Sequence, residues 1–198
     1  MKNLNTEIAK KMLEAGENIA KMIASESFEL WQRKDFRFYV DFDNQDQTEQ
    51  DRIFNELEVS LIGLYVLRLD QAIVGAQREK VIAFKAFRAS IQEGFLKLLE
   101  DTGVDNKFVK QWKVLMDMRL KEYREHLKFA LEESLKDKNF REKDAELRPT
   151  WARVETMKID CLTHIRRGKF DEKDPLWKFL TKWFITLDAR LAPLTEMK

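Results

Sequence analysis

The stretch from Val59 to Leu69, with the sequence VSLIGLYVLRL, constrains the fold more than any other part of this chain. Eight of its eleven residues are apolar, and they leave hardly any helix face for water. A helix that is apolar all round must be covered by other elements on most sides. Eleven residues are also too few to cross a bilayer, which takes about 20. The stretch therefore predicts the central helix of a helical bundle.

The composition favours helices over strands throughout the chain. Hydrophobic residues make up 44% and charged residues 36% of the 198 positions, which is typical of a globular protein with a charged exterior. Only six glycines and three prolines interrupt long runs of good helix formers. We therefore predict one all-α domain over residues 1–198, a single bundle of five or six helices.

Apolar periodicity and end signals place the individual helices. One ambiguity is whether residues 51–99 form one helix or two. An unbroken helix of about 50 residues would be roughly 75 Å long, too long for a compact domain of this size, so we expect a break near Leu69–Ala76. Helix starts are expected at Asp46 or Thr48 and at Asp174–Pro175, where a short polar side chain can cap the first turn. The expected helices are 6–31, two within 48–102, 105–135, one from Pro149 to Gly168, and one from Pro175 to Pro193.

Residues 36–43 break the helical pattern. Phe36, Phe38, Val40 and Phe42 alternate with polar residues or tyrosine, which is the period of a half-buried strand. Because no other run alternates in this way, the favoured interpretation is a short extended connector that lays its aromatic rings on the bundle. The alternative is a strand that pairs with a second copy or with another protein by edge addition.

Two pairs of residues have the spacing of possible metal ligands. Glu122 precedes His126 by four residues and Asp160 precedes His164 by four, so each pair shares one helix face. Histidine with carboxylate suits zinc or iron, and we state a metal site at these four residues as a hypothesis. Pairing on the helix surface is the favoured alternative. Glycine-rich phosphate loops and the Glu-x-x-His pairs of di-iron bundles are absent from the sequence.

No catalytic residue is predicted. Cys161 lies one turn from His164, which could activate a thiol, but it shares an apolar stripe with Val154 and Met157, so a small buried side chain is the favoured interpretation. The basic cluster Arg166, Arg167 and Lys169 is interpreted as complementing a helix carboxyl end. We therefore expect neither an enzyme nor a resident cofactor, and no binding of nucleic acid.

The net charge of +1 gives no general attraction to nucleic acid or to an anionic membrane. Cys161 is the single cysteine, so no internal disulfide is possible, and the first residues lack the apolar run of a signal peptide. We therefore expect a cytoplasmic protein that does not bind membranes.

The aromatic residues suggest the function. Those that exceed the apparent needs of one core are Phe36, Phe38, Phe42, Trp177, Phe179 and Trp183. Because aromatic residues are enriched at the centres of interfaces, we predict a non-enzymatic interaction protein that self-associates or serves as an adaptor or assembly subunit. Its partner is another protein or a second copy. The alternative is a helical bundle that binds a small apolar ligand or a metal ion between helices.

Overall fold

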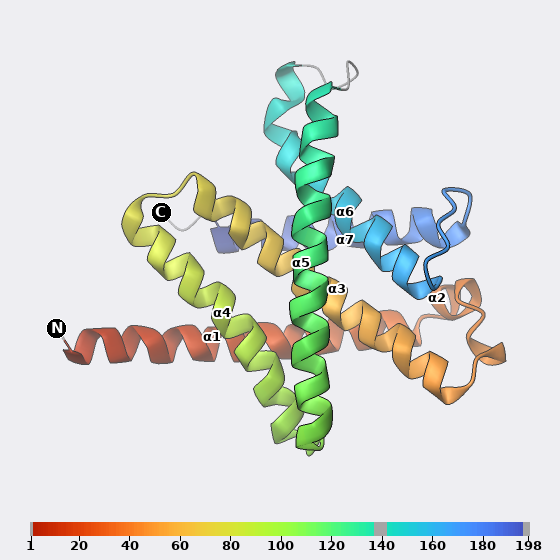
Figure 1. The fold of residues 1–198 in the computed structure, drawn as a ribbon, viewed down its shortest axis with the longest axis horizontal. Coiled ribbons are helices and arrows are strands. Elements are labelled where there is room, and N and C mark those ends of the chain that lie inside the picture. The colour runs from red at the N-terminus through yellow and green to blue at the C-terminus, as the bar shows by residue number, and fades with distance from the viewer. Residues whose placement is uncertain (1, 137–141, 196–198) are drawn as a thin grey trace.

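The computed structural model describes residues 2–136 and 142–195 and confirms the all-α prediction (Figure 1). Over these residues the chain forms α-helices and short 3-10 turns, with no strand. The elements are α1 (Lys2–Gln32), α2 (Lys34–Tyr39), η1 (Phe42–Asn44), α3 (Gln47–Val74), α4 (Arg78–Asp101), α5 (Asn106–Lys136), η2 (Glu142–Leu147), α6 (Arg148–Ile165) and α7 (Pro175–Thr195).

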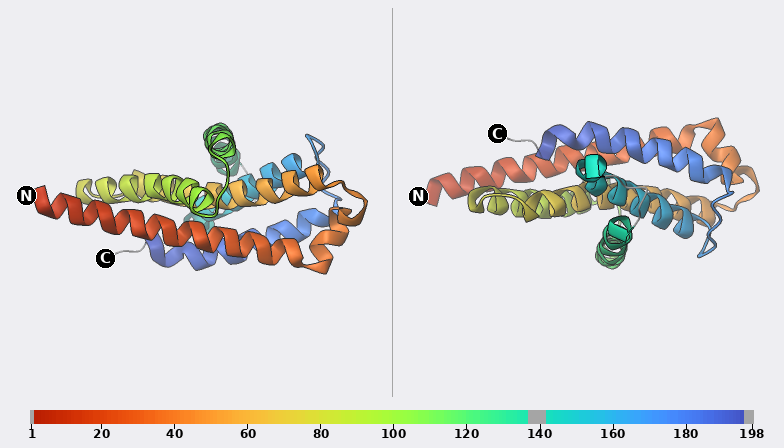
Figure 2. Two further views of the ribbon diagram at one scale, coloured as in Figure 1. Left: turned by 90° about the horizontal axis from the view of Figure 1, so that it is seen from below. Right: turned by 90° about the horizontal axis from the view of Figure 1, so that it is seen from above.

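Helix α3 lies at the centre of the molecule, as the apolar stretch predicts. Every residue from Glu56 to Leu67 is buried, and α3 packs against α1, α4, α5, α6 and α7. Figure 2 shows three levels: α1 and α7 on one side, α3, α4 and α6 in the middle, and α5 on the opposite outer side. Among the helices of residues 2–136 and 142–195, none combines the length and the apolarity that a membrane crossing requires.

The predicted helix ends follow from local chemistry. Asp46 caps α3, where its Oδ1 accepts a hydrogen bond from the backbone N–H of Glu49 at 2.8 Å. Asp174 caps α7 through the N–H of Leu176 at 2.9 Å. Helix α3 ends at Val74, with Gly75 as its C-cap, so residues 51–99 form two helices as expected. Helix α7 continues to Thr195, two residues beyond the expected end at Pro193.

The aromatic connector differs from the prediction because it is helical rather than extended. Its residues form the six-residue helix α2 and the turn η1, joined through Asp41 in a left-handed conformation with φ of 55°. Phe36 and Val40 are buried one helical turn apart, whereas Phe38 points outward and is 80% exposed. The alternating pattern led to the wrong prediction because residues four apart, such as Phe36 and Val40, share one face both in a strand and in a helix.

Candidate functional site

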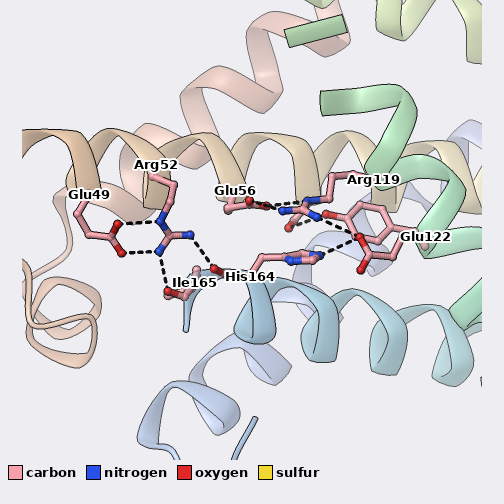
Figure 3. Close-up of polar contacts among 9 residues, drawn as sticks. Glu49, Arg52, Glu56, Arg119, Glu122, His164 and Ile165 are labelled. Atoms are coloured by element: carbon pink, nitrogen blue, oxygen red, sulfur yellow. Dashed lines mark hydrogen bonds and ion pairs between the residues drawn. The ribbon is translucent and has the colours of Figure 1, made fainter. Parts of the chain in front are cut away.

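Charged side chains from three helices meet where α3, α5 and α6 come together (Figure 3). We call this group the polar seam, and it consists of Glu49, Arg52, Glu56, Arg119, Glu122 and His164. Figure 3 shows it running along one side of α3, from Glu49 at one end to Arg119 and Glu122 at the other. Because the seam links ionisable side chains of three helices beside the buried central helix, it is the first candidate for a functional site.

Arg119 of α5 is the middle of the seam. Its Nη2 and Nε donate to the two carboxylate oxygens of Glu56 at 2.7 and 3.2 Å, and its Nη1 donates to Glu122 at 3.1 Å. The same Glu122 oxygen lies 3.1 Å from Nε2 of His164 on α6. Glu56 is only 5% exposed, so the guanidinium is what compensates its buried charge. These contacts tie α5 to both α3 and α6.

Arg52 and Glu49, at one end of the seam, cap the carboxyl end of α6. Arg52 donates to the backbone carbonyls of His164 and Ile165 at 2.6 and 2.8 Å, which satisfies acceptors that the last turn leaves open. Glu49 accepts hydrogen bonds from Arg52 and from Arg167. These two guanidinium groups lower the pKa of Glu49 to about 2. The carboxylate therefore stays ionised over the whole ordinary pH range.

A second acid–histidine contact lies one turn before His164 on α6. Nδ1 of His126 is 2.7 Å from Oδ1 of Asp160, and Asp160 is 3% exposed. Burial raises the pKa of Asp160 to about 6, although His126 acts in the opposite direction. The other oxygen, Oδ2, is buried with no hydrogen-bond partner in the part of the chain that is described. Burial also lowers the pKa of His164, and Arg119 acts in the same direction.

The four residues of the metal hypothesis lie at the interface between α5 and α6, but each histidine contacts the acid of the other predicted pair. Glu122 contacts His164 and His126 contacts Asp160, so each pair bridges α5 and α6 instead of lying along one helix. Over residues 2–136 and 142–195, no group of three histidine, cysteine, aspartate or glutamate side chains is placed to hold a metal ion. The metal site stays a prediction.

Cys161 lies deep in the interface beside the seam. It is fully buried, and burial raises the pKa of its thiol to about 12, so the thiol is protonated at neutral pH. Tyr123 is buried next to it, with its hydroxyl 3.5 Å from Oγ of Ser60. The ring fits because residue 63 is glycine: a Cβ there would lie 2.6 Å from the Tyr123 ring. This part of the interface is packing, as the apolar stripe indicates.

The six predicted interaction residues do not form one surface. Phe36 and Phe42 are buried, and Phe42 packs against Trp31 with ring centroids 4.6 Å apart. Phe179 is half-buried and lies 6.0 Å from Phe36, ring to ring. Trp177 and Trp183 are half-buried against the core. Only Phe38 of the six is fully open to solvent, at 80%.

The basic cluster after α6 is engaged within the chain. Arg166 binds Asp174 at 2.6 and 3.0 Å and the backbone carbonyl of Tyr39 at 2.7 Å. Arg167 binds Glu49. Both arginines therefore hold the α6–α7 connection in place, which agrees with the interpretation that the cluster has a structural role.

The outer face of α5 is a second candidate site, which the sequence analysis missed. Val114, Met118 and Phe129 are 68%, 51% and 64% exposed. At about 100° per residue they lie within roughly 60° of arc on the helix surface, opposite the buried face that includes Met116 and Leu127. Their spacing was a readable signal, but the stronger stripe on the inner face of the same helix masked it.

No protein-family model, curated protein or solved structure matches this chain.

Proposed function

We propose that this chain is a non-enzymatic interaction protein that self-associates, with the outer face of α5 as its interface. The observation that carries the proposal is the stripe of three exposed apolar side chains, Val114, Met118 and Phe129, on one face of the outermost helix. The charged residues Lys121 and Glu125 lie between Met118 and Phe129 on that face. Figure 2 shows α5 standing outside the other helices, so its outer face can meet a flat or ridged partner without hindrance. Methionine and aromatic residues such as Met118 and Phe129 are enriched in protein–protein interfaces.

The polar seam supports this role because it fixes the position of α5. Arg119 holds the helix to α3 through charge-assisted hydrogen bonds to Glu56 on its inner side. Glu122 faces α6 there, with its carboxylate 3.1 Å from Nε2 of His164. A helix held in this way presents its outer face as a rigid surface, and a rigid surface loses little conformational entropy on binding. Helix α5 therefore contributes to the seam with its inner face and carries the stripe on its outer face.

The order of residues along α5 favours a second copy as the partner. In an antiparallel pair centred between Lys121 and Glu122, Val114 of one copy lies opposite Phe129 of the other. In the same register Met118 lies opposite Glu125 of the other copy. A two-fold axis repeats each of these contacts, as a closed homodimer requires. This register brings the two ends of the stripe together, so we take a second copy of the chain as the partner.

Light scattering after gel filtration tests the proposal over a range of protein concentrations. We expect the mass to approach that of two 23.6 kDa chains as the concentration rises. Met118→Lys places a charge within the stripe and should keep the protein monomeric. Ile82→Lys is the matched control, because Ile82 is 66% exposed on α4, away from the stripe. A wild-type protein that stays monomeric at every concentration overturns the proposal.

A further inference from the structure

An open groove of about 240 Å³ lies between the carboxyl half of α1 and helix α7, on the side of the molecule opposite to α5 (Figure 2). Both helices pack on α3. On each of them the residues that line the groove recur at positions i, i+3, i+4 and i+7, counting Arg33, which directly follows α1. Residues with this spacing share one helix face, so α1 and α7 each turn one face toward the groove.

Contacts between the two helix faces mark the two ends of the groove. At one end, Nη1 of Arg190 donates to Oε1 of Glu26 at 2.6 Å. At the other end, the guanidinium of Arg33 lies over the ring of Phe179, with Cζ 4.8 Å from the ring centroid, and donates to Asp35. Because the chain itself compensates the charges at both ends, a ligand must be recognised by the groups between them.

Between these ends the groove is lined by one acid and one base that have no partner. Glu29 of α1 and Lys182 of α7 are both exposed. Within residues 2–136 and 142–195, neither side chain makes an ion pair or a hydrogen bond, and the two do not pair with each other. Their charges sum to zero. A ligand with both an ammonium and a carboxylate can therefore use both groups, whereas a simple anion or cation would leave one of them unused.

The apolar lining of the groove is partly buried. Leu30 is 2% exposed, and the rings of Phe179 and Trp183 are half-buried against the core. Aromatic rings pack favourably against other aromatic rings, so this lining suits a ligand that carries one. Sites for drug-sized molecules have volumes of about 300–1,000 Å³, and the smaller volume of this groove limits the ligand to a smaller molecule.

We propose that this groove binds an α-amino acid with an aromatic side chain. Its ammonium group contacts Glu29 and its carboxylate contacts Lys182, while its ring packs against Phe179 and Trp183. The groove shares no residue with the exposed stripe of α5 or with the polar seam, so the proposal does not rest on self-association.

Titration calorimetry at low salt with L-phenylalanine and two analogues tests the site. Phenethylamine lacks the carboxylate, and phenylpropionate lacks the ammonium. We expect saturable binding of phenylalanine at one molecule per chain, and binding of each analogue that is weaker by about tenfold or more, because each loses one charge-assisted contact. No saturable binding of phenylalanine at millimolar concentration overturns the proposal. An analogue that binds as tightly as phenylalanine also overturns it.

Two variants test the two charges separately. Lys182→Gln should weaken the binding of phenylalanine by about tenfold and leave that of phenethylamine, which has no carboxylate, unchanged. Glu29→Gln should weaken phenylalanine to a similar degree and leave phenylpropionate unchanged. Because both side chains are exposed and unpaired within the described residues, neither substitution removes a contact from the fold. If both variants bind phenylalanine as tightly as the wild type, the ligand does not contact these charges and the proposal is wrong.

Matched controls separate a local effect from a general one. Lys178→Gln removes an exposed charge on α7 one turn before Lys182, at a residue that does not line the groove, and Glu93→Gln removes an exposed charge on α4. Both control variants should bind phenylalanine with the wild-type affinity. Losses in the controls that equal those in the groove variants would show an effect of net charge alone, which contradicts a local site.

Discussion

Glu58 and Glu49 lie nine residues apart on α3, and their surroundings shift their pKa values in opposite directions. Two arginines lower the pKa of Glu49 to about 2, whereas burial raises the pKa of Glu58 to about 8. Glu58 is 6% exposed in the centre of the bundle. It is therefore protonated at pH 7, and the folded state holds a proton that the unfolded chain releases above about pH 4.5.

This difference predicts that stability falls as pH rises from about 5 to 8. The folded state binds more protons than the unfolded state in that window, so the Glu58 contribution is complete below the unfolded pKa and is lost as pH rises through the folded pKa. The loss is about 1.4 kcal/mol per pH unit at most. Glu58→Gln should flatten the pH dependence of the urea unfolding free energy, and the exposed control Glu132→Gln should leave it unchanged. Equal slopes for wild type and Glu58→Gln would contradict the prediction.

The pair of Arg119 and Glu56 makes a second prediction. Arg119→Met leaves the buried Glu56 carboxylate without its guanidinium partner, and breaking a buried pair in this way costs about 3–5 kcal/mol. The double variant Arg119→Met with Glu56→Leu removes both charges and should recover most of the loss. Urea unfolding of the two single variants and the double variant measures the coupling. If the costs of the single variants simply add, the two side chains do not stabilise each other.

At the scale of elements, α1 and α4 pack through two glycines. A Cβ at Gly94 would lie 2.6 Å from the carbonyl carbon of Gly16, and a Cβ at Gly16 would collide with the Ser90 backbone. Gly16→Ala should therefore separate the helices and destabilise the fold by about 1–3 kcal/mol or more. Gly75→Ala, where the added Cβ meets no atom, is the control and should change stability by less than about 1 kcal/mol. Thermal unfolding of both variants measures the difference, and equal midpoints would show that the crossing tolerates a side chain.

The elements that the sequence predicts well are those whose ends depend on neighbouring residues. Asp46 and Asp174 cap helices because a short side chain reaches an N–H two or three residues away, which a local pattern reveals. The prediction of an extended connector at 36–43 was wrong because apolar residues at alternate positions fit both a strand and a single helix turn. The two structures differ in the position of Phe38, which points outward in the helix and would share the face of Phe36 in a strand. Which structure forms depends on how Phe36 packs into the core, and the local sequence does not show this.

The candidate site was predictable only in part, because its contacts join residues far apart in the chain. Glu122, His126, Asp160 and His164 were identified from their spacing, yet their true partners lie across the interface between two helices. Glu56 and Arg119 are 63 positions apart and were missed. An acid next to the apolar central stretch does indicate a buried charge that needs a partner, but it does not say which of 36 basic residues supplies it.

At the scale of the whole molecule, the proposed self-association through α5 predicts that stability depends on protein concentration. The proposed dimer would bury the stripe of Val114, Met118 and Phe129, which only the folded chain presents, so association would stabilise the native state by mass action. The urea midpoint of the wild type should therefore rise with protein concentration. Met118→Lys should give a midpoint that does not depend on concentration and that equals the wild-type value at the lowest concentration. Ile82→Lys, exposed on α4, should follow the wild type. A wild-type midpoint that stays constant while light scattering shows dimers would mean that the isolated chain is as stable as the pair, and that the interface adds no stability to the fold.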